Sequence, residues 1–208
     1  MSIFEIMKIF FLILFILPFE LSAQDFEALS SNEFGFSIDK PKKWVLWEKQ
    51  EIQNSFTKFD FTKKEKGEIL ANNNRSVLVF SFARSKSLKK GETMIPLVQV
   101  YLMPNGDTTF DGFEKSFVQS VDKAVRPYFK EFEYLEKPNR IELDGKSAIT
   151  MLNKTKLLHN GKEVVSRSRV IAVPKGSYFF QISLTDGYQN DDCQELYSKI
   201  IDSIKIVD

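Results

Sequence analysis

The first 23 residues carry the longest apolar run of the chain. The run Ile9–Leu17 follows Lys8, and the small residues Ser22 and Ala23 come shortly after it. A basic start, an apolar stretch and small residues in this order are typical of a secretory signal peptide, and the run is shorter than the roughly 20 residues of a membrane-spanning helix. We expect residues 1–23 to be a signal peptide cleaved after Ala23, the alternative being a retained membrane anchor. The mature protein would then be exported, periplasmic or secreted, without a stable membrane span.

Beyond this segment the pattern changes to short alternations. Residues 24–33 are mostly polar, and we expect a mobile lead-in. Residues 34–208 contain no long linker or repeat, so we expect a single domain. Alternating positions predict a strand over 34–38, ended by Pro41. Further strands are expected at 44–47 and 56–61, and the charged stretch 63–74 is expected to be a loop.

The middle of the chain predicts two interior strands and a helix. Residues 76–84 are apolar on both faces, which is typical of a central strand, and residues 95–103 form another strand with Pro96 at its end or at a sheet edge. The helix is expected to begin at Asp111 as N-cap, with Glu114 completing a capping-box-like pair, and to end before Pro127. Its apolar stripe consists of Phe113, Phe117, Val121, Ala124 and Val125.

The last third of the chain predicts hairpins and a final helix. Asp144-Gly145 and Asn160-Gly161 are preferred centres of two-residue hairpin turns, because both turn positions favour positive φ. Strands are expected on either side of these turns, and also at 178–184. Residues 129–135 are expected to be a strand, the alternative being a further helical turn. A final helix, capped by Asp191 or Asp192, carries an apolar stripe of Leu196, Tyr197, Ile200, Ile201 and Ile204. Because hairpin-linked strands outnumber helices, we predict an α+β fold, an antiparallel sheet with helices packed on it.

Four motifs in this order resemble a known family. They are FGFSI-x-x-P-x-x-W at 34–44, LDGKSA at 143–148, GSYFFQI at 176–182 and IIDSIKI at 200–206. The set resembles the PsbP-like and Mog1-like domains, which include exported bacterial members of unassigned role. The resemblance implies an α/β/α sandwich with a central, mostly antiparallel sheet flanked by helices. It also implies accessory or binding roles, in photosystem assembly, in binding a small GTPase or in secretion systems, and it transfers no catalytic residues.

Composition removes several classes of function. Lys and Arg number 29 and Asp and Glu 28, so the basic excess typical of nucleic-acid binding is missing, and we expect no nucleic-acid partner. No spacing of the nine Gly matches a phosphate-binding motif, and we expect no cofactor.

Residues with catalytic or metal-binding chemistry are few. The only imidazole, His159, is expected at an exposed hairpin end, where a Ser–His or Cys–His pair is disfavoured. The only thiol, Cys193, cannot form an internal disulfide and is expected as a small buried residue, although a reactive or intermolecularly paired thiol is the alternative. Asp186, Asp191 and Asp192 could offer oxygen ligands to Ca²⁺, but their spacing is not that of an EF-hand, and helix capping accounts for the last two. We therefore expect no metal site.

A basic cluster is the main candidate site. A two-residue turn at Asn160-Gly161 makes partner numbers sum to 321, which places Lys154 opposite Arg167 and Leu152 opposite Arg169, on the same face as Lys156. Like charges directly opposite are destabilising unless something neutralises them. One interpretation is a face for an anionic ligand or an acidic partner. The alternative is a solvated strand face, with acids such as Glu142 or Glu163 nearby.

These observations lead to a ranked set of functional hypotheses. The leading one is an exported, non-catalytic binding or accessory domain that acts through a protein partner or an envelope component, with Lys154, Lys156, Arg167 and Arg169 as its candidate face. The second is a small-molecule or lipid carrier with a Phe-lined cavity, since fifteen of the twenty Phe follow the signal segment. A carboxylate-based hydrolase is the third.

Overall fold

A computed structural model describes residues 25–48, 50, 62, 76–90, 92–159, 161–188 and 193–207. The expected signal peptide, the strand expected at 56–61 and the loop expected at 63–74 lie outside the described residues, as do Asp191 and Asp192. No helix in the described part of the chain is long and apolar enough to cross a membrane.

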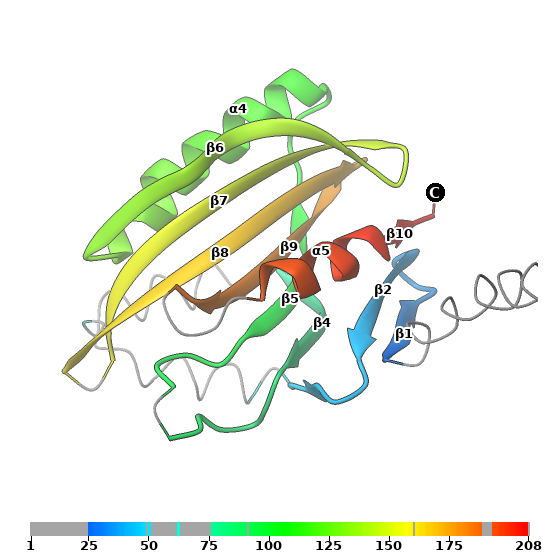
Figure 1. The fold of residues 1–208 in the computed structure, drawn as a ribbon. Helices are drawn as coiled ribbons and strands as arrows, with labels where there is room; N and C mark the ends of the chain where they lie inside the picture. The colour runs from blue at the N-terminus through cyan, green and yellow to red at the C-terminus, as the bar shows by residue number, and fades with distance from the viewer. Residues whose placement is uncertain are drawn as a thin grey trace, which may run out of the picture.

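A large antiparallel sheet forms the centre of the molecule (Figure 1). Its order is β3-β4-β5-β9-β8-β7-β6 among the described strands. Their bounds are β3 Val45–Leu46, β4 Val77–Ala83, β5 Leu97–Pro104, β6 Glu131–Leu143, β7 Lys146–His159, β8 Lys162–Lys175 and β9 Tyr178–Gly187. β4, which the sequence predicted to be central, is second from the edge. Its outer neighbour is the short β3, which pairs with it at only two residues.

The two predicted hairpin turns are confirmed. Asp144 and Gly145 both have positive φ, 50° and 73°, in the turn between β6 and β7. Gly161 has φ 72°, and the register from His159↔Lys162 onward is the one that a two-residue turn requires. The expected strand at 129–135 begins at Glu131 and continues to Leu143, with register shifts on both sides of Glu136.

A second, smaller sheet, which the sequence did not predict, includes the N-terminal end of the described chain. β1 (Phe26–Ser31), β2 (Phe36–Pro41) and β10 (Lys205–Ile206) form it in the order β1-β2-β10. The lead-in that we expected to be mobile therefore contains a strand. This strand is ordered because it pairs with β2 along its whole length. Between the two strands, Glu27 forms an ion pair of 2.6 Å with Lys40, whose side chain is buried. Phe26 and Leu29 of this strand also pack against the core, so pairing with β2 and apolar packing together order the lead-in.

Helix α4 (Phe110–Ser120) begins two residues earlier than predicted. Its N-cap is Thr109, whose hydroxyl accepts a hydrogen bond of 3.1 Å from the Gly112 N–H. The expected cap, Asp111, and its expected partner Glu114 instead bind Arg140 on β6. The helix continues as a π-helix, Val121–Val125, and a 3₁₀-helix, Arg126–Tyr128, so the chain stops being α-helical before Pro127. Ala124 and Val125, at the end of the predicted stripe, are exposed.

Helices cover both faces of the large sheet. α4 packs its Phe113 and Phe117 on one face, in a cluster with residues such as Ile149. Helix α5 (Gln194–Asp202) and the small sheet pack on the other face, where Tyr197 and Ile200 join the larger cluster. The α+β sandwich expected from the sequence is thus confirmed. α5 begins after Cys193, and its predicted apolar stripe faces the core.

Candidate functional site

The predicted register of the basic cluster is confirmed. Lys154 pairs with Arg167, Lys156 with Val165 and Leu152 with Arg169 across β7 and β8. Side chains alternate between the two faces of a strand, so all four predicted cations originate on the face that α5 partly covers.

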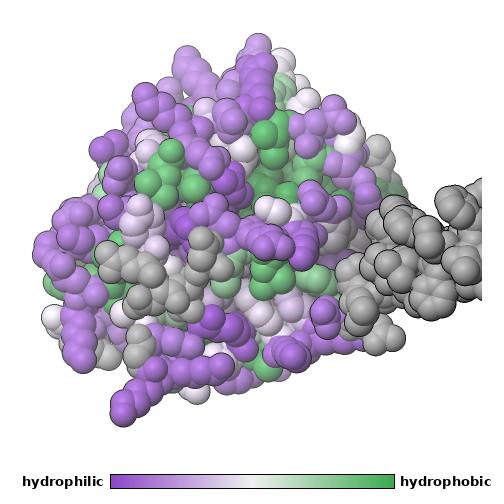
Figure 2. Space-filling view, in the orientation of Figure 1, coloured by the Kyte–Doolittle hydropathy of each residue, from purple (hydrophilic) through white to green (hydrophobic). Residues whose placement is uncertain are grey.

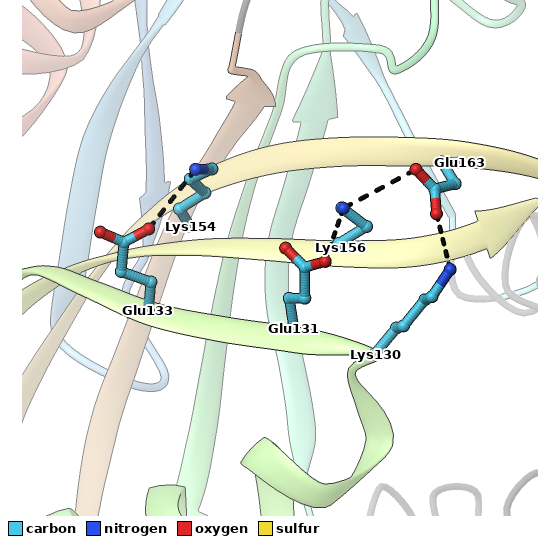
Figure 3. A network of polar contacts seen from close by, with 6 residues as sticks. All are labelled: Lys130, Glu131, Glu133, Lys154, Lys156 and Glu163. Carbon is cyan, nitrogen blue, oxygen red and sulfur yellow. Dashed lines mark hydrogen bonds and ion pairs between the residues drawn. The ribbon is translucent and has the colours of Figure 1, made fainter.

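Carboxylates from β6 alternate with these cations. Glu131 is the partner of Lys156 and Glu133 the partner of Lys154. The Lys156 Nζ lies 2.6 Å from Glu131 Oε1, and the Lys154 Nζ lies 3.4 Å from Glu133 Oε2 (Figure 3). Lys154 also lies over the ring of Tyr188, 4.8 Å from its centroid. The two lysines therefore do not form a purely basic stripe.

The pattern extends to both ends of the strands. At one end, Glu163 on β8 binds Lys130 at 2.6 Å and Lys156 at 3.7 Å. At the other, Arg169 donates two hydrogen bonds to Glu136, of 2.9 and 2.8 Å. These cations hold the pKa of the Glu136 and Glu163 carboxyls below the usual value, mainly through hydrogen bonds to the charged form. We call this surface the charged face. It consists of Lys130, Glu131, Glu133, Glu136, Lys154, Lys156, Glu163 and Arg169.

Of the two acids named from the sequence, Glu163 takes part in the charged face and Glu142 does not. Glu142 is the partner of Ser147, close to the Asp144-Gly145 turn. The acids that sequence reasoning missed, Glu131, Glu133 and Glu136, all lie on β6. Only the fold brings them beside β7.

Arg167 lies beneath this surface. Its guanidinium donates to both carboxylate oxygens of Asp186 on β9, at 3.0 and 2.8 Å, and only 9% of its side chain is exposed. Asp186 also accepts a hydrogen bond of 2.9 Å from the Cys193 N–H, directly before α5. Arg167 therefore helps to fix the start of α5, whose N-cap is Cys193 and not the predicted Asp191 or Asp192.

A cavity of about 240 Å³ lies between part of α5 and the sheet. Aliphatic side chains such as Leu152 and Ile171 line it, together with Arg167 and Arg169. Thr150 also lines it, and its buried hydroxyl has no hydrogen-bond partner within the described chain. Figure 2 shows apolar side chains emerging between polar ones on this side of the molecule.

A second groove, of about 280 Å³, lies on the opposite face of the sheet. Phe117, Phe129 and Phe132 line one side of it. This is the feature of the structure that corresponds to the Phe-lined cavity considered above.

The other candidates have structural contacts. His159 ends β7 next to the turn. Asp186 is held by the Arg167 guanidinium and the Cys193 N–H. Within the described residues, no three His, Cys, Asp or Glu side chains are grouped as a metal site would need.

Comparisons with known proteins identify the fold. No family model matches the chain, and neither does any curated protein. Among solved structures, cyanobacterial PsbP (CyanoP) from Synechocystis sp. PCC 6803 is 10% identical with a TM-score of 0.53, and the match covers 91% of this chain and 97% of that one. This likeness shows that the chain has a PsbP-like fold, as the order of its motifs implied.

Two further structures are more distant. The Ran-binding protein Mog1p of Saccharomyces cerevisiae is 9% identical, with a TM-score of 0.49 over 88% of this chain and 96% of that one. LpqN of Mycobacterium tuberculosis, involved in cell envelope biogenesis, is 13% identical, with a TM-score of 0.47 over 88% and 92%.

Proposed function

We propose that the mature chain is an exported, non-catalytic binding domain that holds a protein partner or another envelope component against the charged face. The observation that carries this proposal is the alternation of cations and carboxylates across β6, β7 and β8. Lys154, Lys156 and Arg169 present the contact, while Arg167 supports the scaffold below them.

The energetics of exposed ion pairs favour such a role. Each pair at the surface is worth about 0–1 kcal/mol, so a partner can replace it at small cost. A pattern of alternating sign also discriminates between partners and speeds their encounter, because only a complementary pattern gains from all the contacts. The charged face is thus better suited to recognition than to holding the fold together.

The titratable residues support a domain without chemistry of its own. His159 ends β7 and Cys193 precedes α5, so the only imidazole and the only thiol sit on different elements. The carboxyls of Glu136 and Glu163 have lowered pKa values, whereas hydrolysis by paired carboxylates uses one acid with a raised pKa.

Site-specific crosslinking in the native envelope tests the binding face. A photo-crosslinker replaces Leu158, which is exposed on the same face of β7, and the matched control replaces Leu88, exposed in the loop between β4 and β5. We expect a discrete partner to crosslink from position 158 and not from 88. Equal products from both positions, or none from 158, would sink the proposal.

Charge variants make this experiment sharper. Lys154→Glu with Lys156→Glu should lower the crosslinking yield at least tenfold. Adding Glu131→Lys and Glu133→Lys restores the pairs of residues 131 with 156 and 133 with 154, with the charges exchanged. We expect this four-residue variant to fold as the wild type does but to remain defective in crosslinking to the partner. Wild-type yield from this four-residue inversion would show that the partner does not contact this face.

Export is tested separately. We expect the protein purified from its own host to be recovered outside the cytoplasm with Gln24 as its first residue by N-terminal sequencing. A protein that retains residues 1–23 would contradict cleavage.

A further inference from the structure

The groove on the α4 side of the large sheet has an unusual lining. Its residues come from β5, β7, β8, β9, the loop before β5, and the segment from α4 to the start of β6. None of the described lining residues is charged, although 27% of the chain is. Lys and Glu are the ordinary residues of an exposed sheet face, so this lining differs from that of a simple solvated surface.

The floor of the groove consists of hydroxyl and amide side chains. By register, Ser168 is the partner of both Asn153 and Thr185, so these side chains lie across adjacent strands on one face. We call this surface the uncharged face. It consists of Gln99, Asn153, Thr155, Ser166, Ser168, Gln181, Ser183 and Thr185.

Some of these groups satisfy one another and others do not. Thr155 and Ser166 share a hydrogen bond of 2.7 Å, and Ser168 and Thr185 share one of 2.9 Å. Asn153 is only 5% exposed, and it lines the groove without a hydrogen bond from its side-chain amide to another described residue. The amide is not among the buried polar groups that are sealed from solvent. An occupant of the groove can therefore hydrogen-bond to the Asn153 amide in place of water.

The wall opposite the floor is aromatic and aliphatic. Phe117 comes from α4, Phe129 follows the 3₁₀-helix, and Phe132 lies at the start of β6. The rings of Phe129 and Phe132 are 6.0 Å apart, and both residues are half-buried. The groove thus offers an apolar surface and a hydrogen-bonding surface to the same occupant.

These properties restrict the chemistry of a ligand. A charged ligand would be desolvated with no counter-charge among the described lining residues, which is costly. A hydrocarbon would exclude water from the Asn153 amide without offering it a hydrogen bond. Hydroxyl and amide side chains both donate and accept, and so match a neutral molecule with many hydroxyl groups and one apolar face.

A sugar ring has both features, since its C–H groups form an apolar face and its hydroxyls surround the edge. We propose that the groove on the α4 side binds a neutral saccharide, with the Asn153 amide hydrogen-bonded to a sugar hydroxyl and a ring face packed against Phe129, since Arg126 already lies over the ring of Phe132. At about 280 Å³ the groove is just below the 300–1,000 Å³ typical of ligand pockets. It suits one sugar ring of a larger glycan.

The test uses the full mature chain and a panel of neutral sugars. Glucose, galactose, mannose, N-acetylglucosamine, cellobiose, maltose and chitobiose are titrated while the Asn153 side-chain amide is followed by NMR. Glucuronate, hexanoate and the acyclic polyol sorbitol serve as charged, apolar and non-ring controls. We expect at least one neutral sugar to shift the Asn153 amide saturably, and the three controls to leave it unchanged.

Variants then locate the site. Asn153→Leu should weaken binding of that sugar about tenfold or more, and Lys154→Met, the next residue on the opposite face, should leave it unchanged. Ser183→Ala, at a half-buried position of the floor, provides a milder second variant with a loss of about threefold if Asn153→Leu fails to fold. No response to any neutral sugar, an equal response to sorbitol or glucuronate, or unaltered binding by both floor variants would overturn the proposal.

This site is independent of the charged face. The four-residue charge inversion should bind the sugar normally, and Ser183→Ala should crosslink its partner normally from position 158. A loss of sugar binding in the charge inversion would mean that the groove is not a separate site.

Discussion

Strands β7 and β8 differ sharply between their two faces. On the α5 side, Lys154, Lys156 and Arg169 alternate with carboxylates from β6. On the α4 side, the adjacent residues Asn153 and Thr155 belong to the uncharged face, and both are buried. The difference teaches that one pair of strands can separate two kinds of polar surface: exchangeable charges where solvent screens them, and neutral hydrogen-bonding groups where desolvation would penalise a charge.

The largest expected effect concerns the buried pair beneath the charged face. Asp186→Ala leaves the Arg167 guanidinium buried without its carboxylate, and we expect the free energy of unfolding to fall by about 3–5 kcal/mol. Arg169→Ala, which removes an exposed pair on the same strand, should cost less than about 1 kcal/mol. Urea unfolding of both variants measures the contrast. Similar losses would show that burial does not separate the two pairs.

A smaller effect is expected on the uncharged face. Thr155→Val leaves the buried Ser166 hydroxyl without its partner and should lower the free energy of unfolding by about 1 kcal/mol. Combining it with Ser166→Ala should cost less than the sum of the two single changes, because both unpaired groups are then gone. Additive losses in a double-mutant cycle would contradict a direct bond between the two hydroxyls.

Acid should separate the two faces. The pKa values of Glu136 and Glu163 are lowered in the folded protein, so their contribution to stability is complete above the ordinary pKa of 4.5 and is lost as the pH falls through the lower folded pKa. Carbon-13 NMR of the two carboxyls should show midpoints below 4.5, and Arg169→Ala should raise that of Glu136. The amide signal of Thr155 should not follow these titrations. A midpoint at or above 4.5 would mean that the ion pairs do not persist in solution.

The smallest effect is expected from exchanging one exposed pair. Glu133→Lys with Lys154→Glu keeps opposite charges on the two paired residues, so the free energy of unfolding should stay within about 0.5 kcal/mol of the wild type. Lys154→Glu alone places two carboxylates opposite each other and should be the less stable of the two variants. Thermal unfolding in low salt compares them, and equal stability of the single and double variants would remove any role for this pair.

Local sequence rules predicted the helices, strands and turns better than they predicted which side chains meet across different strands. The Asn160-Gly161 turn sufficed to predict Lys154 opposite Arg167, because a two-residue hairpin fixes the register. The acids beside them could not be predicted in the same way, since the pairing of β6 with β7 shifts on both sides of Glu136. The burial of Arg167 depends on Asp186, which reaches it from β9, and nothing local in the sequence indicates that contact.

The uncharged face was hidden for a related reason. Each strand contributes only one to three of its residues, and within β7 they alternate with Lys154 and Lys156. Ser and Thr near charged residues indicate an ordinary surface strand until the strands are aligned. The predicted start of α4 was wrong for a simpler reason. Thr109 and Asp111 are both good capping residues, and only the backbone shows that Thr109 adopts the extended conformation of an N-cap.

The two edges of the described sheet restrict how other chains can approach it. β6 is long, but Pro138 lacks an N–H, the register shifts interrupt its ladder, and carboxylates follow its length. β3, at the other edge, pairs over only two residues. Edges of these kinds are poor templates for a further strand. The described edges therefore disfavour edge-to-edge polymerisation, and the partner that we propose would have to recognise side chains rather than extend the backbone of the sheet.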